Sequence, residues 1–304
     1  MKVLVLGARG FLGSHVTSKL AESGIPYEGR SLSDGFDLTD GEFSLKAVKQ
    51  IRPTHIINCA AFVGGIQYGY RFPGDIFRIN LQMTLNLLEI GRHTEIERIV
   101  NPISNCAYPA RLHLFREEEF WDGPLHDSVL AYGFARKASS VGSWAYHEQY
   151  GTDWLNLILS NMYGPGDHFD EERSHALGAL IMKTVRANEN GDPSISVWGT
   201  GSPVREWLYV VDGAEALVRA LSAPPTVGPI NVGIASGISI SQLVNIIKEA
   251  VGYEGEVSYD PSKPDGAPYK TVDGTKGREL LGWTPTTDLK EGIHRTVEWY
   301  IENR

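Results

Sequence analysis

Apolar runs and amphipathic stretches alternate along the first half of the chain. Continuous apolar runs are typical of parallel strands that are covered on both faces. Strands are predicted at residues 2–6, 25–30, 54–60, 96–104 and 154–160, and helices at residues 11–23, 40–51, 75–92 and 131–149. One apolar stripe of the third helix has helical spacing and consists of Ile76, Ile79, Met83, Leu87 and Ile90. This succession predicts a doubly wound parallel sheet with right-handed crossovers.

The alternation weakens after Tyr163. The elements still predicted there are two helices and one strand, at residues 175–187, 239–251 and 195–198. We expect a Rossmann-type α/β domain that binds a dinucleotide and a smaller C-terminal α/β substrate domain. Their expected bounds are residues 1–163 plus about 206–235 for the first domain, and about 164–205 plus 236–304 for the second.

Composition and charge narrow the possible functions. Of the 304 residues, 42% are hydrophobic and 21% are charged, so disorder is not indicated. The net charge of −9 argues against a nucleic-acid partner. No apolar run reaches 18 residues and Met1 leads directly into a predicted strand, so neither a membrane span nor a leader is expected. Two cysteines cannot form a disulfide framework, which favours a reducing cytoplasm.

A glycine turn follows the first predicted strand and opens the first helix. Gly7, Gly10 and Gly13 have the spacing G-x-x-G-x-x-G. In this context the glycines allow a tight turn, close approach of a pyrophosphate and close packing of the helix on the strand. The helix start at Phe11 and Leu12 is predicted to bind the phosphates through backbone N–H groups. A glycine-rich turn without a ligand is the alternative interpretation.

The residues after the second predicted strand favour NADP(H) over NAD. Arg30 and Ser31 follow that strand, and Arg9 lies within the glycine turn. Two guanidinium groups and a hydroxyl suit a 2′-phosphate, because arginine binds phosphate through paired donors. In the alternative, Arg30 is a solvated loop residue and Glu28 binds the ribose. Asp37-Leu38 is predicted to reach the adenine. The segment Asn58-Cys59-Ala60-Ala61, with Ala60 and Ala61 as cofactor residues, is predicted to pass under the phosphates and the ribose.

Longer motifs occur along the chain: Val63-Gly64-Gly65-Ile66, Ser104-Asn105-Cys106-Ala107-Tyr108-Pro109, Asn161-Met162-Tyr163-Gly164-Pro165-Gly166-Asp167-His168-Phe169, Ser174-His175, residues 197–206 and Lys263-Pro264-Asp265-Gly266. Together with the glycine turn and Tyr132, they resemble the extended short-chain dehydrogenases/reductases and, within them, the GDP-L-fucose synthase family. The resemblance implies an NADPH-dependent epimerase/reductase acting on GDP-4-keto-6-deoxymannose. No metal site is visible in the sequence, and this chemistry needs none.

The resemblance also implies roles for single residues. Ser104 and Tyr132 hold and protonate the ketone oxygen during reduction, as a hydroxyl and a phenol can do. Cys106 and His175 exchange protons beside the ketone, since a thiolate and an imidazole both do so near neutral pH. Read alone, Cys106 is a small apolar residue and His175 a residue at the surface of a helix start. His175 is also expected beside the cofactor.

Five further positions resemble residues that surround the diphosphate, nucleoside and sugar, where Ser104 also lies: Asn161, Lys183, Trp198, Arg205 and Asp265. For these the alternative is a solvated charge or a packed aromatic ring. Family members pair through helices that correspond to residues 75–92 and 131–149. A homodimer is therefore expected, with small or apolar residues on the second helix such as Ala131, Ala135, Ala138 and Val141.

Three departures from the family pattern stand out. The family has a lysine four residues after the tyrosine, but here that position is Arg136. Lys137 lies about 100° further round the helix and should point elsewhere. We expect Arg136 to take over the lysine's contact with the nicotinamide ribose and its charge effect on Tyr132. Asn105 and Tyr269 are the other departures, at positions where a serine and a basic residue are common.

Three functions follow from these observations. The first is the complete epimerase/reductase reaction. The second is an epimerase or 4-ketoreductase with only part of this chemistry, or with another sugar or base. The third is a non-catalytic subunit that binds a dinucleotide. The joint presence of Ser104, Cys106, Tyr132 and His175 argues against the third.

Overall fold

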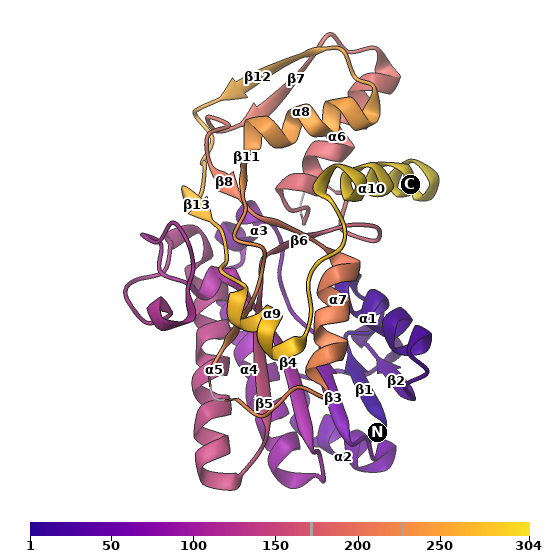
Figure 1. The fold of residues 1–304 in the computed structure, drawn as a ribbon, viewed down its shortest axis with the longest axis vertical. Helices are drawn as coiled ribbons and strands as arrows, with labels where there is room; N and C mark the ends of the chain where they lie inside the picture. Colours follow the sequence, from indigo (N-terminus) through magenta and orange to yellow (C-terminus); the bar gives the residue numbers. More distant parts are fainter. Residues whose placement is uncertain (171–172, 227) are drawn as a thin grey trace.

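The computed structural model describes residues 1–170, 173–226 and 228–304. At its centre lies a six-stranded parallel sheet in the order β10-β5-β4-β3-β1-β2 (Figure 1). Its strands are β1 (Val3–Leu6), β2 (Tyr27–Arg30), β3 (His55–Asn58), β4 (Arg98–Ser104), β5 (Trp154–Leu159) and β10 (Ile230–Val232). The predicted doubly wound α/β fold is confirmed. The strand order reverses between β1 and β3, where such folds bind their ligands.

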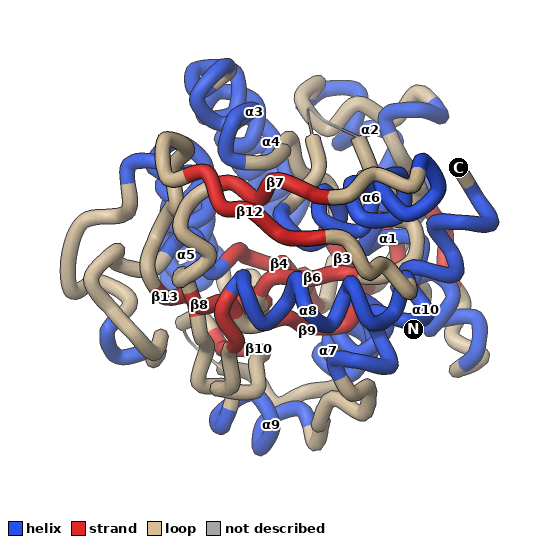
Figure 2. Tube along the Cα trace, turned by 90° about the horizontal axis from the view of Figure 1, so that it is seen from above, coloured by secondary structure: helices blue, strands red, loops and turns tan. Residues whose placement is uncertain are grey.

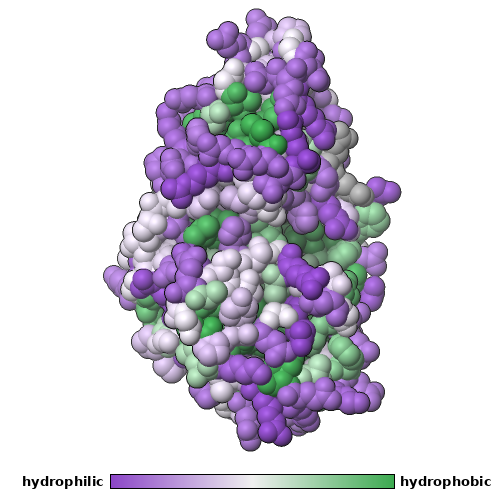
Figure 3. Space-filling view, turned by 90° about the vertical axis from the view of Figure 1, so that its right-hand side faces the viewer, coloured by the Kyte–Doolittle hydropathy of each residue, from purple (hydrophilic) through white to green (hydrophobic). Residues whose placement is uncertain are grey.

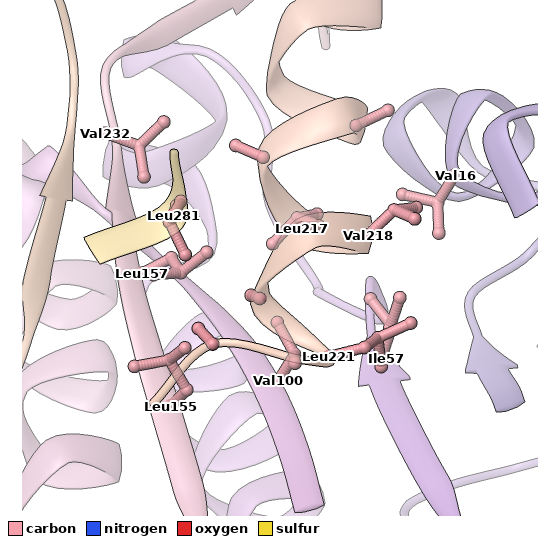
Figure 4. Packing of buried hydrophobic residues seen from close by; sticks show 14 of the residues in the cluster. Val16, Ile57, Val100, Leu155, Leu157, Leu217, Val218, Leu221, Val232 and Leu281 are labelled. Atoms are coloured by element: carbon pink, nitrogen blue, oxygen red, sulfur yellow. The ribbon is translucent and has the colours of Figure 1, made fainter. Parts of the chain in front are cut away.

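Helices cover both faces of this sheet. One face carries α1 (Phe11–Glu22), α7 (Val210–Ala220) and α9 (Thr275–Leu281), and the other carries α2 (Gly41–Ile51), α4 (Pro73–His93) and α5 (Leu130–Tyr150). The side chains of β1 alternate, so that Val3 and Val5 join the first core and Leu4 and Leu6 the second. Figure 4 shows the first core, where Leu221, which directly follows α7, lies beside Val100 and Ile57.

A smaller lobe stands above the carboxyl ends of the strands (Figure 1). It holds α6 (Ala176–Asn190), α8 (Ile240–Val251), α10 (Leu289–Asn303) and the parallel pair β7 (Ser194–Trp198) and β12 (Glu256–Asp260). Figure 2 shows β7 and β12 side by side. These helices and strands share an apolar core of their own. The expected domain bounds stay a prediction; α9, from the C-terminal part, packs on the sheet through Leu281.

Short elements connect the sheet and the lobe. The strands are β6 (Asn161–Tyr163), β8 (Val204–Arg205), β9 (Trp207–Tyr209), β11 (Ile238–Ser239) and β13 (Tyr269–Lys270). The remaining helices are α3 (Ile66–Arg71) and 3₁₀ turns at Leu32–Asp34, Asn105–Ala107, Glu117–Glu119 and Asp127–Val129. The strand β8 pairs with β11 on one side and β13 on the other. This pairing brings residues near 204, 238 and 270 together beside the lobe.

The predicted elements recur within a few residues of their expected ends. The stripe on α4 faces inward as predicted, with Ile76, Met83, Leu87 and Ile90 buried. Ser239 caps α8 through Gln242 in a reciprocal pair of hydrogen bonds. No prediction was made for α3, α7, α9 or α10. Within the described residues, no helix is both long and apolar enough to cross a membrane.

Candidate active site

A cleft with a volume of about 1640 Å³ opens between the carboxyl ends of the strands and the smaller lobe. Most of the predicted site residues line it: Gly10, Phe11, Leu12, Ala60, Ala61, Ser104, Cys106, Tyr132, Arg136, Asn161, His175, Lys183, Trp198, Arg205 and Asp265. The other predicted residues lie outside its wall, namely Gly7, Arg9, Gly13, Arg30, Asp37 and Leu38. The fold therefore gathers one site from segments far apart in the sequence.

The glycine turn forms a bare backbone cradle at one end of the cleft. A Cβ on Gly7 would lie 2.7 Å from the backbone nitrogen of Ala60, and one on Gly13 would lie 2.1 Å from the Gly7 carbonyl oxygen. Gly7 also has a backbone φ of 73°, a value that residues with a side chain rarely adopt. Gly10 begins α1 without any side-chain cap. The free N–H groups of the first turn therefore face the cleft, as an anion site requires.

The two arginines of the expected 2′-phosphate site lie beside one another. The backbone N–H groups of Gly7 and Ala8 donate to the Arg30 carbonyl at 2.8 and 3.2 Å. The N–H of Arg9 donates to Ser31 Oγ at 2.8 Å. These bonds attach the end of β2 to the glycine turn. Both arginine side chains remain solvent-accessible, so their guanidinium groups are open to a phosphate.

Carboxylates already occupy part of this region. Glu28 accepts from Arg30 Nη2 at 2.5 Å and lies 3.5 Å from Lys2 Nζ. Asp34 pairs with Arg9 Nε at 3.5 Å. Glu28 is thus engaged by two cations, which disfavours the alternative in which it binds the ribose. The arginines keep their remaining donors for a further anion.

The two residues predicted to contact the adenine already make contacts within the protein. Asp37 Oδ1 accepts from the backbone N–H and the hydroxyl of Thr39, at 2.8 and 2.7 Å. The Leu38 side chain packs into the core under the sheet. The Leu38 carbonyl accepts from Asn86 Nδ2 at 2.8 Å, which leaves the second carboxylate oxygen of Asp37 and the backbone N–H of Leu38 for an adenine. Their role as cofactor residues stays a prediction.

Ser104, Cys106 and Tyr132 meet where β4 ends against α5. Ser104 Oγ accepts from the Cys106 N–H at 3.1 Å and so caps the short turn that follows. A Cβ on Gly133 would lie 2.3 Å from the Cys106 carbonyl oxygen. Because Gly133 has no side chain, the backbone at Cys106 lies directly against α5, the helix that carries Tyr132.

The positions after Tyr132 differ as the helical spacing predicts. Arg136 is buried, its guanidinium carbon lies 5.0 Å from the centroid of the Tyr132 ring, and its Nη2 donates to Asn80 Oδ1 at 3.1 Å. Its Nε is buried without a hydrogen-bond partner in the described structure. Lys137 instead turns away and donates to the Phe120 carbonyl at 2.5 Å. The structure therefore places Arg136, and not Lys137, beside the tyrosine.

Asn80 of α4 fixes the place of Arg136. Its Nδ2 donates to the carbonyls of Phe62 and Ile76 at 2.8 and 2.7 Å, and its Oδ1 also accepts from the Phe62 N–H. Phe62 belongs to the loop that follows β3 and lines the cleft. The buried amide thus connects this loop, α4 and Arg136. Sequence analysis did not single out Asn80, because its partners are distant in the chain.

His175 immediately precedes α6 and lines the cleft from the side of the lobe. A Cβ on Gly65 would lie 2.5 Å from the Ser174 carbonyl oxygen, so the glycine admits this segment. The residue is exposed to solvent at the open side of the cleft. Restricted solvation inside the cleft, and then the positive charge of Lys270, lower the pKa of His175 to about 4. The imidazole of the free protein is neutral at neutral pH.

Lys270 is a site residue that sequence analysis missed. Its ammonium donates to Cys106 Sγ at 3.2 Å. The register of β13 with β8 places Lys270 beside Arg205, and both line the cleft. Tyr269 points the other way and stacks on His113 with ring centroids 4.1 Å apart. A contact between residues 164 positions apart leaves no local signal in the sequence.

At the predicted substrate end of the cleft, polar side chains already form hydrogen bonds within the protein. Arg205 donates to the carbonyls of Val204 and Asp265 at 2.9 and 3.2 Å, and burial lowers the pKa of its guanidinium to about 10. Asp265 uses one carboxylate oxygen for the Thr200 N–H and the other for the Thr200 hydroxyl. Both carboxylate oxygens of Asp265 are thus engaged by Thr200, and its direct contact with substrate stays a prediction.

The remaining predicted substrate residues also lie in the cleft wall. Lys183 Nζ donates to the Ser196 carbonyl at 2.5 Å, and Asn161 Nδ2 to the Glu206 carbonyl at 2.8 Å. Trp198 is 45% exposed, with the Lys263 ammonium 5.7 Å from its ring centroid. An exposed indole in a cleft wall offers a flat surface for a nucleobase. Asn105 is buried beside the cleft, and its Nδ2 has no partner among the described residues.

Within residues 1–170, 173–226 and 228–304, no group of three or more histidine, cysteine or acidic side chains has the arrangement for a metal ion. Cys59 and Cys106 are both free thiols. Burial raises the pKa of Cys59 to about 12, so this thiol is inert near neutral pH. Cys59 packs against the first core.

The chain is similar to known proteins over nearly its whole length. The chain is 34% identical over 312 residues to GDP-L-fucose synthase 1 of Arabidopsis thaliana, covering 99% of this chain and 94% of the relative. It is 30% identical to GDP-L-colitose synthase of Yersinia pseudotuberculosis, covering 100% and 99%. The crystal structure of a GDP-L-fucose synthetase from Naegleria fowleri bound to NADP superposes with a TM-score of 0.90 at 28% identity, covering 99% and 94%.

A family model also matches most of the chain. The model describes the NAD dependent epimerase/dehydratase family and matches residues 3–233. These residues contain the glycine turn, the turn with Cys106 that follows β4, the helix α5 with Tyr132 and the segment around His175. The chain belongs to the NAD dependent epimerase/dehydratase family.

Proposed function

We propose that this protein is an NADPH-dependent epimerase/reductase that acts on a GDP-linked 4-keto-6-deoxy hexose. The observation that carries the proposal is that one cleft brings Ser104, Cys106, Tyr132 and His175 together below the glycine turn. Relatives at 30–34% identity that span nearly the whole chain are named GDP-L-fucose synthase or GDP-L-colitose synthase. The same names support a GDP-linked substrate.

The residues of the cradle fit the cofactor. The first turn of α1 and the bare glycines receive the pyrophosphate, while Arg9 and Arg30 meet the 2′-phosphate. Arg136 lines the cleft, and its buried Nε has no hydrogen-bond partner among the described residues, so we expect its guanidinium to donate to a hydroxyl of the nicotinamide ribose. When bound, NADPH supplies the hydride for reduction of the ketone.

Epimerisation requires a base and an acid on opposite sides of the carbon beside the ketone. In our assignment the Cys106 thiolate takes the proton from this carbon and becomes a thiol, leaving an enolate. An imidazolium at His175 returns a proton to the other side and becomes neutral, so one proton leaves and one arrives. The bound diphosphate supplies negative charge that favours this imidazolium. Ser104 and Tyr132 stabilise the oxygen while it carries negative charge.

Reduction uses the same oxygen. Tyr132 donates its phenolic proton as the ketone becomes an alcohol, and Ser104 holds the oxygen by a hydrogen bond. The guanidinium of Arg136 beside the ring stabilises the phenolate that remains. Arg136 therefore takes the place of the lysine that family members carry.

Incubation with GDP-4-keto-6-deoxymannose, with and without NADPH, tests the proposal. We expect NADPH absorbance to fall and NMR of the product to show inverted stereocentres. Deuterium incorporation from solvent without NADPH consumption would favour an epimerase alone. Tight NADPH binding without turnover of any GDP-linked 4-keto sugar would favour a non-catalytic subunit. The similarity to GDP-L-colitose synthase supports including the substrate of that enzyme in the same assay.

We also propose that the protein forms a homodimer through α4 and α5. These helices expose large apolar side chains, which soluble monomers rarely gather on one face. They are Phe77, Leu85, Phe134, Val141 and Trp144, each 40–54% exposed. Ala135 is 1% exposed and faces inward, so this member of the expected small-residue face lies outside the proposed contact. On the face shown in Figure 3, apolar side chains form separate patches among polar ones.

A reducing cytoplasm is the compartment that we infer. Both cysteines are free thiols, and the proposed mechanism needs one of them unoxidised. Localisation of a tagged full-length chain by fluorescence microscopy, with fractionation as a second measure, tests this inference.

A further inference from the structure

Lys270 has no function in the mechanism above, yet its ammonium lies in the middle of the proton-transfer groups. It donates to Cys106 Sγ at 3.2 Å and is the neighbouring charge that most lowers the pKa of His175. It also lowers the pKa of His126, which lies in the loop before α5. One cation therefore borders both groups proposed to exchange protons with the substrate.

Backbone pairing holds this ammonium in place. The Lys270 carbonyl accepts from the Glu206 N–H at 2.9 Å, and β13 runs parallel to β8. Glu206 is fully buried, and its carboxylate accepts from Ser160 Oγ at 2.6 Å and from the Val272 N–H at 2.9 Å. The lysine side chain thus extends from an edge strand that is held against β8. The thiol is equally fixed through Ser104 and Gly133.

The charge of Lys270 is not neutralised by a carboxylate. In the described ranges, no salt bridge involves Lys270, and its side-chain hydrogen bond goes to the thiol. The charged and titratable groups around this pair are Arg205 on β8, Asp265 before β13, His175 at α6, and His126 and Asp127 before α5. Asp265 is bound to Thr200, so the cations dominate close to the sulfur.

We propose that Lys270 is a positioning residue for Cys106, holding the sulfur as a thiolate directed into the cleft so that it acts as the base of epimerisation. The proposal rests on the proposed function for its last clause, but the contact itself can be tested without any substrate. A cation in contact with a cysteine favours the thiolate, which is the reactive form. Lys270 keeps its own proton throughout and transfers none to the substrate.

Alkylation of Cys106 by iodoacetamide, followed by peptide mass spectrometry from pH 5 to 10, measures the thiolate directly. We expect Lys270→Met to shift the midpoint of the rate profile upward and to slow alkylation at pH 7 by about tenfold or more. Lys270→Arg should restore most of the rate. Lys276→Met, at an exposed position of α9, is the matched control and should behave as wild type. Cys59 serves as an internal unreactive thiol.

Two outcomes would overturn the proposal. One is an unchanged profile in Lys270→Met. The other is a Lys270→Arg variant that is as slow as Lys270→Met, since charge would then not be the cause. Lys270 could instead bind the phosphates of the substrate, and titration of each variant with GDP distinguishes this role. A large loss of GDP affinity with an unchanged alkylation profile would make Lys270 a phosphate ligand. A shifted profile without any deuterium exchange on GDP-4-keto sugars would keep the Lys270–Cys106 coupling and refute the proposed function.

Discussion

The guanidinium of Arg136 lies one helical turn from Tyr132, with its central carbon 5.0 Å from the ring centroid. This relationship puts a permanent charge where the family has a lysine. Arg136→Met should weaken NADPH binding about tenfold or more, because a charged hydrogen bond contributes about 1.5–3 kcal/mol. It should also slow reduction and move its alkaline pH limit upward. Calorimetric titration and a pH–rate profile measure the two effects.

Lys137→Met is the matched control for Arg136. The Lys137 ammonium donates to the Phe120 carbonyl and lies over the rings of Phe120 and Trp121. Its removal should lower the free energy of unfolding by about 1–3 kcal/mol and leave NADPH affinity unchanged. Arg136→Lys restores the family arrangement and should retain reduction. Damage from Lys137→Met with a silent Arg136→Met would contradict the assignment.

Preference for NADPH over NADH should depend on the two arginines beside Ser31. The double variant Arg9→Met/Arg30→Met removes both guanidinium groups and should weaken NADPH binding by about 1.5–3 kcal/mol or more. NADH affinity should change little, since NADH lacks the 2′-phosphate. Lys19→Met, at the other end of α1, controls for the loss of positive charge. Equal dissociation constants of the wild type for the two cofactors would refute the site.

Proton exchange and hydride transfer should separate by mutation. Cys106→Ser and His175→Asn should abolish deuterium incorporation beside the ketone, while both variants bind NADPH as the wild type does. Mass spectrometry of recovered substrate measures the exchange. Exchange at the wild-type rate in both variants would remove these residues from the mechanism.

Stability should depend on pH through Asp167, a buried residue of the cleft wall. Burial raises the pKa of its carboxyl to about 7, against the hydrogen bond from the His168 N–H. Because the folded-state pKa is raised, the stabilising contribution is complete below the unfolded value near 3.8 and is lost as the pH rises through 7. Asp167→Asn should match the wild type at pH 4 and exceed it at pH 8 by about 2–4 kcal/mol.

Urea unfolding at both pH values measures this difference. Asparagine keeps the acceptor for His168 and removes only the ionisation. Asp75→Asn, at an exposed position of α4, controls for the change in net charge. A gain that is the same at pH 4 and pH 8 would show that ionisation of Asp167 is not its cause.

Assembly should be sensitive to the exposed apolar side chains of α5. Phe134, which lies 6.0 Å from Phe77 between ring centroids, and Trp144 are each about half exposed. A buried charge without a partner is costly at an apolar interface, so Phe134→Glu or Trp144→Glu should produce monomers. Ile301→Glu, on the exposed side of α10, should leave the mass unchanged. Light scattering of the wild type at working concentration must give a dimer for this proposal to stand.

Local patterns in the sequence determined the sheet and its glycine turn. Strands buried on both faces are almost continuously apolar, helices repeat every 3.6 residues, and a phosphate cradle needs glycines at set spacing, so each leaves a mark in neighbouring residues. The placement of Arg136 beside Tyr132 also follows from helical geometry alone. The roles of Ser104, Cys106 and His175 came from resemblance, since a single thiol or imidazole has no chemical signature of its own.

Tertiary structure decided what lies next to those residues. The contact of Lys270 with Cys106, the hold of Asn80 on Arg136 and the engagement of Asp265 by Thr200 join elements that are far apart in the chain. Each depends on strand register or helix packing, which no short window of sequence contains. The helices α3, α7, α9 and α10 were not predicted for a related reason. Packing on the sheet or the lobe stabilises such helices more than their intrinsic propensity does.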